Sequence, residues 1–206
     1  MKKSLIIPVE NQVREFDPKL LLACIAARRG FSALIGSRWE IDNRIASFER
    51  SVYLSKSMTA RGGKMFQIMR KIGHEIVAWD EEALVHLPPE TFFSRRISPT
   101  GIKHVSHLFA WGQDNADLWR QYPHLSPRTP IHITGNPRGD MLRPEMRNFY
   151  GREVKTIQNT HGEFILINTN VNHVNAFYPH QNLFMPVKNP GEEPRFGKAA
   201  RGMSRE

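Results

Sequence analysis

Apolar residues along this chain occur in two alternating patterns, short continuous runs and longer stretches with helical spacing. The short runs predict β-strands at residues 5–9, 31–35, 52–54, 74–79, 105–111, 131–134 and 164–167. The helical spacing predicts helices at residues 17–30, 39–47, 64–72, 114–121 and 144–158, with shorter helical segments at 81–86 and 91–96. Because strands and helices alternate, the sequence predicts an α/β fold built from βαβ units around a mostly parallel sheet.

Two signals at the ends of these elements refine the prediction. Asp17-Pro18 is a typical helix start, with an N-cap side chain followed by proline at the first helical position, and Gly30 is a typical helix end. Residues 171–206 instead contain four prolines and three glycines and show no sustained apolar period. We therefore predict a long loop or an unanchored tail over that last part.

The charge of the chain indicates which partners to consider. The 206 residues carry 29 basic against 20 acidic side chains, a formal charge of +9. The basic residues lie in short pairs spread along the chain rather than in a stripe with interleaved aromatics, so we predict no nucleic-acid partner. A solvated basic surface, binding of phosphate-bearing small molecules and contact with an anionic membrane face remain as alternatives.

Hydropathy and cysteine usage predict a cytoplasmic protein. No apolar run approaches the roughly 20 residues that cross a bilayer, and the first residues lack a cleavage pattern. The single cysteine, Cys24, excludes an internal disulfide, and its Ala-rich surroundings predict a buried thiol.

Polar residues follow most of the predicted strands directly. In open parallel sheets, ligands bind outside the carboxyl ends of the strands, so these residues are expected to share one edge and form the site. In chain order, the candidates are Glu10 and Arg14, then Asp80, Glu81 and Glu82, then Gly112, then Gly135, Asn136, Arg138 and Asp140, and finally Asn168 and Asn170.

Asp80-Glu81-Glu82 is the candidate for acid–base chemistry. Carboxylates crowded at a strand end can raise one another's pKa, which leaves one able to accept a proton near neutral pH. The alternative is structural, since the same residues can cap the helix that follows and place favourable charges in its first turn.

The segment 135–140 combines a tight turn with two charged side chains. The planar fork of Arg138 suits a phosphate or a carboxylate, while an Arg138–Asp140 pair that only stabilises the turn is the alternative. No P-loop and no G-x-G-x-x-G pattern follows any strand, which disfavours an ATP or nicotinamide site, and we predict no cofactor. His104 and His107 have no further ligands in their neighbourhood, so we also predict no metal.

Six segments in order resemble the bacterial surface carbohydrate biosynthesis proteins. The resemblance is carried by the segments 7–10, 14–22, 80–82, 109–112, 134–145 and 165–170, which read IPVE, REFDPKLLL, DEE, FAWG, TGNPRGDMLRPE and ILINTN. It implies a GT-B type arrangement of two Rossmann-like, three-layer α/β/α domains. Residues 1–160 would be the first, acceptor-side domain, and residues 161–206 the first strand and an extended loop of a second domain that is incomplete here.

The resemblance also implies a function and its partners. Such a protein would transfer a sugar from a nucleotide-sugar donor to a carbohydrate or lipid-linked acceptor in capsule or lipopolysaccharide assembly, in the cytoplasm and in possible contact with the anionic inner membrane. Asp80, Glu81 and Glu82 are the candidate catalytic residues, with Glu81 or Glu82 as the base, and Arg138 is the candidate anion contact. Because the second domain is incomplete, we expect this chain alone to be inactive.

Two other functions stay open at this point. One is a neighbouring enzyme class, a nucleotide-sugar 2-epimerase or a CDP-polyol phosphotransferase-like enzyme, which shares the Gly-Asn-Pro-Arg-x-Asp element. The other is a non-catalytic fragment, or an interaction domain that binds a membrane surface through its positive charge.

Overall fold

The centre of the chain is a six-stranded, wholly parallel β-sheet with the strand order β2-β1-β3-β4-β5-β6. The computed structural model describes residues 3–83, 87–167, 186–187 and 195–196. Its sheet strands are β1 (Ser4–Val9), β2 (Ser32–Ser37), β3 (Val52–Ser55), β4 (Glu75–Trp79), β5 (Val105–Ala110) and β6 (Ile131–Ile133). Two short strands, β7 (Pro186–Val187) and β8 (Arg195–Phe196), form a separate antiparallel pair.

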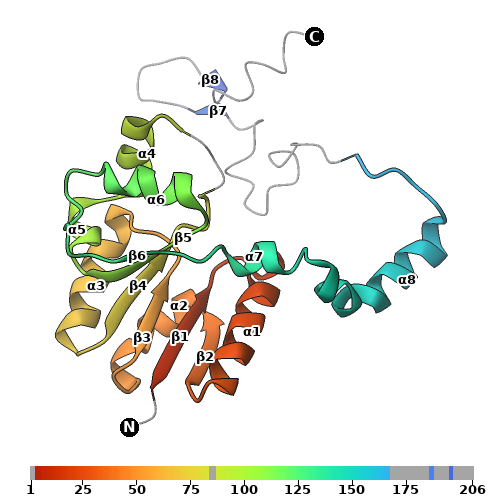
Figure 1. Ribbon diagram of the computed structural model, residues 1–206, viewed down its shortest axis with the longest axis horizontal. Coiled ribbons are helices and arrows are strands. Elements are labelled where there is room, and N and C mark those ends of the chain that lie inside the picture. Colours follow the sequence, from red (N-terminus) through yellow and green to blue (C-terminus); the bar gives the residue numbers. More distant parts are fainter. Residues whose placement is uncertain (1–2, 84–86, 168–185, 188–194, 197–206) are drawn as a thin grey trace. The chain divides into compact units, whose positions relative to one another are not determined.

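Helices flank the sheet, as Figure 1 shows. The helical segments are α1 (Gln12–Arg28), α2 (Arg38–Asn43), η1 (Ile45–Ser47), α3 (Ala60–Lys71), α4 (Pro89–Arg96), α5 (Pro99–Ile102), α6 (Gln113–Arg120), α7 (Pro137–Asp140), η2 (Pro144–Tyr150) and α8 (Gly151–His161). This arrangement confirms the predicted α/β class and is that of a Rossmann-like, three-layer fold.

The core consists of two clusters, one on each face of the sheet. Successive strand residues point to opposite faces, so Ile6 belongs to one cluster and Ile7 to the other. The larger cluster packs the sheet against helices α2 to α6, with Phe66 of α3 and Trp119 of α6 fully buried. The second cluster packs the sheet against α1 through Ala23. Strands buried on both faces explain the continuous apolar runs in the sequence.

The strand order reverses direction between β1 and β3, and the two strands separate there. Their pairing covers only Leu5–Val52 and Ile6–Tyr53, so it ends before Pro8. Proline has no backbone N–H to donate to a neighbouring strand. At Pro8 no such hydrogen bond is lost, because β3 has already separated from β1 there. Ligands of doubly wound sheets bind at such a switch point, outside the carboxyl ends of the strands.

Helix α1 begins earlier than predicted. Asn11 is its N-cap, and the Asn11 side chain accepts a hydrogen bond from the backbone N–H of Arg14 at 3.2 Å. The prediction of a start at Asp17-Pro18 is therefore wrong, and Pro18 lies inside the helix. Asn11 lies two residues after the end of β1, so its cap starts the helix six residues before the Asp17 signal.

Three further sequence predictions are corrected. The helix predicted for residues 144–158 consists of the 3-10 segment η2 and the helix α8. Residues 164–167, predicted as a strand, adopt no regular structure and expose their apolar side chains, and none of the described strands pairs with them. Cys24 is exposed, because it faces away from the sheet on α1. The helix predicted at 81–86 falls partly outside the described residues, and its described part, 81–83, is a turn.

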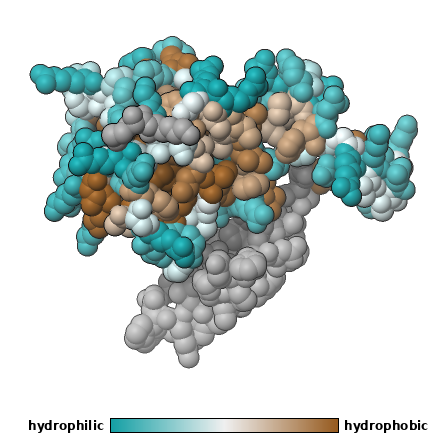
Figure 2. All heavy atoms as spheres, turned by 90° about the horizontal axis from the view of Figure 1, so that it is seen from below, coloured by the Kyte–Doolittle hydropathy of each residue, from teal (hydrophilic) through white to brown (hydrophobic). Residues whose placement is uncertain are grey.

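The internal contacts divide the chain into two compact units, Met1–Arg152 and Glu153–Glu206. The parallel sheet lies in the first unit. The predicted domain boundary near residue 160 stays a prediction. Among the described residues, no helix combines the length and the apolar character that a membrane crossing requires. Apolar residues nevertheless form a broad area on the face of the molecule shown in Figure 2.

Gly101 gives a test of the packing between α5 and the segment before α3. A Cβ at Gly101 would lie 2.8 Å from the Met58 carbonyl oxygen, which accepts a hydrogen bond from the Ser98 N–H. We expect Gly101→Ala to lower the free energy of unfolding by about 1–3 kcal/mol, because backbone has to move. Gly151→Ala is the matched control, since a Cβ there meets no atom within 4 Å. Urea denaturation measures both; equal stabilities would contradict the packing described here.

Candidate functional site

The site is organised around a buried ion pair between Glu15 and Lys19 in α1. The Lys19 Nζ lies 2.9 Å from Glu15 Oε2, and both side chains are almost completely excluded from solvent. Lys19 also donates to the Pro8 carbonyl oxygen at 2.7 Å. That carbonyl lies where β1 has separated from β3, so the lysine uses an acceptor that the sheet leaves unpaired.

Glu15 gathers further donors from two loops. Its Oε2 accepts the backbone N–H of Glu10 at 3.0 Å, and its Oε1 accepts the Nζ of Lys56 at 2.8 Å. Burial alone would raise the pKa of Glu15, but the hydrogen bonds from Glu10, Lys56 and Lys19 outweigh it and lower that pKa to about 2. Glu15 is therefore a structural anion that holds the loops after β1 and β3 together.

A second group of charges lies on the β2 side of Glu15. Glu10 pairs with both Lys56 and Arg38, and Arg38 also contacts Asp42 at 3.2 Å. Burial raises the pKa of Glu10, and the hydrogen bonds from Lys56 and Arg38 lower it by more, so its pKa lies below the usual value. Tyr53 donates to Asp42 at 2.8 Å. The predicted binding residue Glu10 is thus held by two cations of the same chain.

On the other side, Lys19 connects the network to the loop after β4. Glu81 Oε1 lies 3.5 Å from Lys19 Nζ, and Arg138 donates to the Glu81 carbonyl oxygen at 2.9 Å. The Arg138 guanidinium lies over the Trp111 ring, 5.7 Å from its centroid. The structural alternative of an Arg138–Asp140 pair is not what the structure has, because Arg138 contacts Glu81 and Asp140 lies 3.8 Å from Arg143 instead.

The three predicted acidic residues occupy different environments. Asp80 is buried and pairs with Arg96, and its carboxylate also accepts the backbone N–H of Glu82 at 3.0 Å. Glu81 is 5% exposed at its side chain and faces Lys19. Glu82 is 36% exposed and lies 3.0 Å from Arg14. Each carboxylate therefore faces its own cation, and Glu82 is the most accessible of the three.

Several buried polar atoms in this region have no hydrogen-bond partner within the described residues. They are Arg14 Nε, Asp80 Oδ2, Glu81 Oε2, Arg96 Nε and Asn136 Nδ2. Buried polar groups in folded proteins are nearly always paired, so each of these atoms is a candidate contact for a ligand or an ordered water. This edge of the sheet therefore offers unused donors and acceptors in a largely dry environment.

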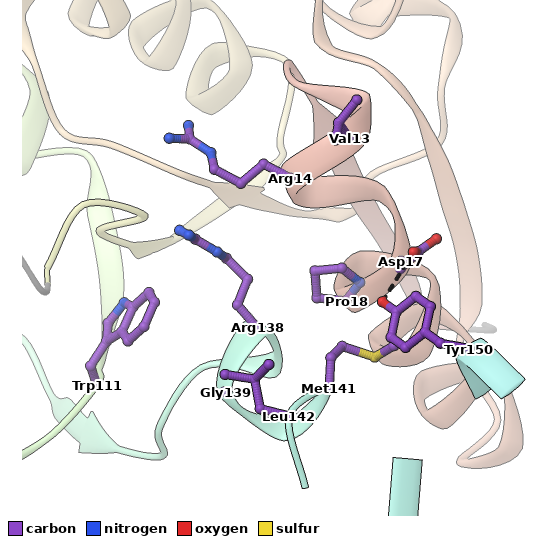
Figure 3. A pocket seen from close by; sticks show the side chains of 10 residues that line it. All are labelled: Val13, Arg14, Asp17, Pro18, Trp111, Arg138, Gly139, Met141, Leu142 and Tyr150. Atoms are coloured by element: carbon purple, nitrogen blue, oxygen red, sulfur yellow. Dashed lines mark hydrogen bonds between the residues drawn. The ribbon is translucent and has the colours of Figure 1, made fainter. Parts of the chain in front are cut away.

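A pocket of about 320 Å³ lies next to the network, between α1, α7 and the end of β5. Arg14 and Arg138 point toward the same side of it, beside the ring of Trp111 (Figure 3). The opposite side is apolar around Pro18 and Met141. There the Tyr150 hydroxyl donates to Asp17 at 3.2 Å. The volume is at the lower end of the range of small-molecule sites.

The remaining predicted site residues have mainly backbone roles. Gly112 precedes α6 as its N-cap in extended conformation. Gly135 has a φ of +76°, which favours glycine, and turns the chain after β6. Asn136 caps α7 by accepting the N–H of Arg138 at 3.0 Å. Asp140 is exposed on α7 and does not line the pocket. Asn168 and Asn170 lie outside the described residues.

Sequence reasoning did not assign five residues of this site: Glu15, Lys19, Lys56, Arg96 and Trp111. The spacing of Glu15 and Lys19, four residues apart on one helix, is a signal that could have indicated their pairing. Lys56 follows β3 directly and met the same strand-end criterion as the others. Arg96 carries no local signal, because its partner Asp80 lies 16 residues away.

Comparisons with known proteins leave the function open. Searches with protein-family models, among curated proteins and among solved structures found no match to this chain. In the described part of the chain, no group of three or more His, Cys, Asp or Glu side chains is arranged to hold a metal ion. The functional conclusion therefore rests on the residues and geometry given above.

Proposed function

We propose that this chain carries the acceptor-side domain of a glycosyltransferase of bacterial surface polysaccharide assembly, of the kind that makes capsule or lipopolysaccharide. The substrates are a nucleotide-sugar donor and a carbohydrate or lipid-linked acceptor. The proposal starts from the sequence resemblance. It requires a Rossmann-like domain with a polar site at the carboxyl edge of its sheet, and both are present.

One observation supports this proposal most directly. The resembling segments are dispersed along the chain, yet their charged residues meet at one edge: Glu10 and Arg14 after β1, Glu81 and Glu82 after β4, and Arg138 after β6. Several of the polar atoms there are buried and unpaired. A motif set that served only the core would leave no such donors and acceptors.

The exposures of the three carboxylates distinguish their roles. Asp80 and Glu81 are buried in ion pairs, so we assign them to positioning. Glu82 is accessible, and its orientation is set by Arg14 and by its own N–H bond to Asp80. Glu82 is therefore the candidate base. It would take the proton of the acceptor hydroxyl while that oxygen bonds to the anomeric carbon. The bond from this carbon to the phosphate oxygen breaks, and the nucleotide leaves with the electron pair.

Glu82→Gln is the variant that tests this role. The assay uses the full-length protein in which this domain is joined to a complete donor-side domain. With UDP- or CMP-sugars as donors and a bacterial lipid-linked saccharide extract as acceptor, we expect acceptor-dependent nucleotide release to fall about 100-fold. Glu90→Gln is the matched control, because Glu90 is an exposed glutamate on α4, and it should leave release within about twofold. Nucleotide release is measured by chromatography.

Other outcomes would contradict the proposal. Isomerised nucleotide sugar formed without acceptor would indicate an epimerase. Unchanged release in both Glu81→Gln and Glu82→Gln would remove both carboxylates as bases. If no donor releases nucleotide with any acceptor even in the full-length protein, a non-catalytic role for the domain is favoured instead.

A further inference from the structure

We propose that the pocket between α1, α7 and Trp111 binds a phosphate ester that carries an apolar group. This inference rests on the proposed function in one respect only, that the ligand would be part of the acceptor. The site has two halves, a cationic side formed by Arg14 and Arg138 and an apolar side that continues to the molecular surface.

The cationic half has unused binding capacity. Of the side-chain N–H groups of Arg138, only Nη1 has an acceptor within the described residues, the Glu81 carbonyl oxygen. The Trp111 ring supports the guanidinium from one side. Arg14 has a buried Nε without a partner among the described residues. Its Nη2 lies 3.5 Å from Glu15, and its Nη1 contact with Glu82 joins two side chains that are each more than a third exposed. Such exposed pairs are weak, so an incoming anion can share Arg14 with Glu82.

Two guanidinium groups from distant segments suit a phosphate monoester particularly well. A phosphate of this kind carries a charge between −1 and −2 near neutral pH and offers three acceptor oxygens, so Arg14 and Arg138 can each contact it without competing. Planar guanidinium groups match the spacing of phosphate oxygens. A ligand with a single neutral polar group would leave these donors unpaired.

The apolar half indicates what the phosphate is attached to. Pro18 and Met141 form the inner wall of the pocket. Val13 and Leu142 line the same pocket, although they are 98% and 83% exposed. Single exposed apolar residues are common, but two on the rim of one cationic pocket place apolar surface on both sides of the arginines. An alkyl, isoprenyl or aromatic ester group would be buried against these apolar side chains.

Calorimetric titration with hexyl phosphate and with inorganic phosphate tests both halves. We expect hexyl phosphate to bind at least about tenfold more tightly, which corresponds to burial of about two methylene groups. Arg14→Gln and Arg138→Gln should each weaken hexyl phosphate binding about tenfold or more. Leu142→Gln should weaken hexyl phosphate and leave inorganic phosphate unchanged, and its exposed position makes misfolding no concern. Arg61→Gln, on the exposed face of α3, is the charge-matched control.

A vesicle experiment identifies the source of the phosphate. Vesicles containing phosphatidic acid present the same monoester in a lipid, and vesicles with enough phosphatidylglycerol to reach the same surface charge present a phosphodiester instead. Binding to phosphatidic acid alone, lost in both arginine variants, would assign the pocket to a lipid headgroup. If hexyl phosphate binds through the two arginines but both vesicle types bind equally and independently of the arginine variants, the pocket is assigned to a soluble phosphate ester.

Two results would overturn the inference. One is equal affinity for hexyl and inorganic phosphate, and the other is an equal loss in Arg61→Gln. Because no donor is present, these titrations do not depend on turnover. The glycosyltransferase proposal can therefore fail while hexyl phosphate still binds. Equally, hexyl phosphate binding can be absent while the glycosyltransferase proposal holds.

Discussion

Glu15→Gln should lower the free energy of unfolding at pH 7 by about 3–5 kcal/mol, because removing one partner of a buried ion pair leaves the other charge uncompensated. The Glu15 carboxylate accepts the Glu10 N–H and faces the Nζ atoms of Lys19 and Lys56 at 2.9 and 2.8 Å. Glutamine can replace one of these acceptors, but it leaves the buried ammonium of Lys19 without a full counter-charge. Urea denaturation is suitable for the measurement, because guanidinium chloride would screen the charges.

The same carboxylate makes stability depend on pH in a defined window. The pKa of Glu15 is about 2 in the folded chain against an ordinary 4.5, because the three hydrogen bonds outweigh the effect of burial. A lowered pKa means that the stabilisation is complete above about pH 4.5 and is lost as the pH falls toward 2. The shift corresponds to on the order of 3 kcal/mol. Glu15→Gln should therefore flatten the stability profile across this window.

Glu90→Gln provides the control for this experiment. Glu90 is an exposed glutamate, so its replacement should change the stability at pH 7 by less than about 0.5 kcal/mol and leave the acid profile of the parent intact. An acid profile of Glu15→Gln as steep as that of the parent chain would show that other carboxylates cause the acid sensitivity.

The fold could be predicted because its strands are buried on both faces. Both faces of the sheet are covered, so neighbouring strand residues are buried on either face; examples are Ile6, Ile7, Ile76 and Val77. Such strands appear in the sequence as short apolar runs. Residues 164–167 form a run of the same kind, but no described strand pairs with them. An apolar run therefore indicates a possible strand, and only a neighbouring strand can supply the hydrogen bonds that form one.

The site could be predicted only in part, for a related reason. The rule that ligand sites lie at strand ends located Glu10, Glu81, Glu82 and Arg138 at one edge, because topology alone brings strand ends together. It could not say which carboxylate is buried, since that depends on side chains from other segments. Glu81 is buried because Lys19 reaches it from α1, and no local pattern around residue 81 contains that information.

Lys19→Gln should be about as destabilising as Glu15→Gln, again by about 3–5 kcal/mol, because Lys19 is shared by three acceptors. It contacts Glu15 at 2.9 Å, the Pro8 carbonyl at 2.7 Å and Glu81 at 3.5 Å. Without it, two buried carboxylates lose their common cation. The pKa of Glu15 should rise, since one of the groups that lower it is gone, and acid unfolding should begin at higher pH than in the parent chain.

The double variant Glu15→Gln, Lys19→Gln decides whether the two residues act as one unit. Once either partner is replaced, the remaining buried charge is the main source of the cost, so removing it as well should recover part of the stability. The double variant should therefore be more stable than the sum of the single effects predicts, by about 0.5–3 kcal/mol. Strict additivity in urea denaturation would mean that Lys56 and the Glu10 N–H, rather than Lys19, compensate the charge of Glu15. In that case Lys56→Gln should show the coupling that Lys19→Gln lacks.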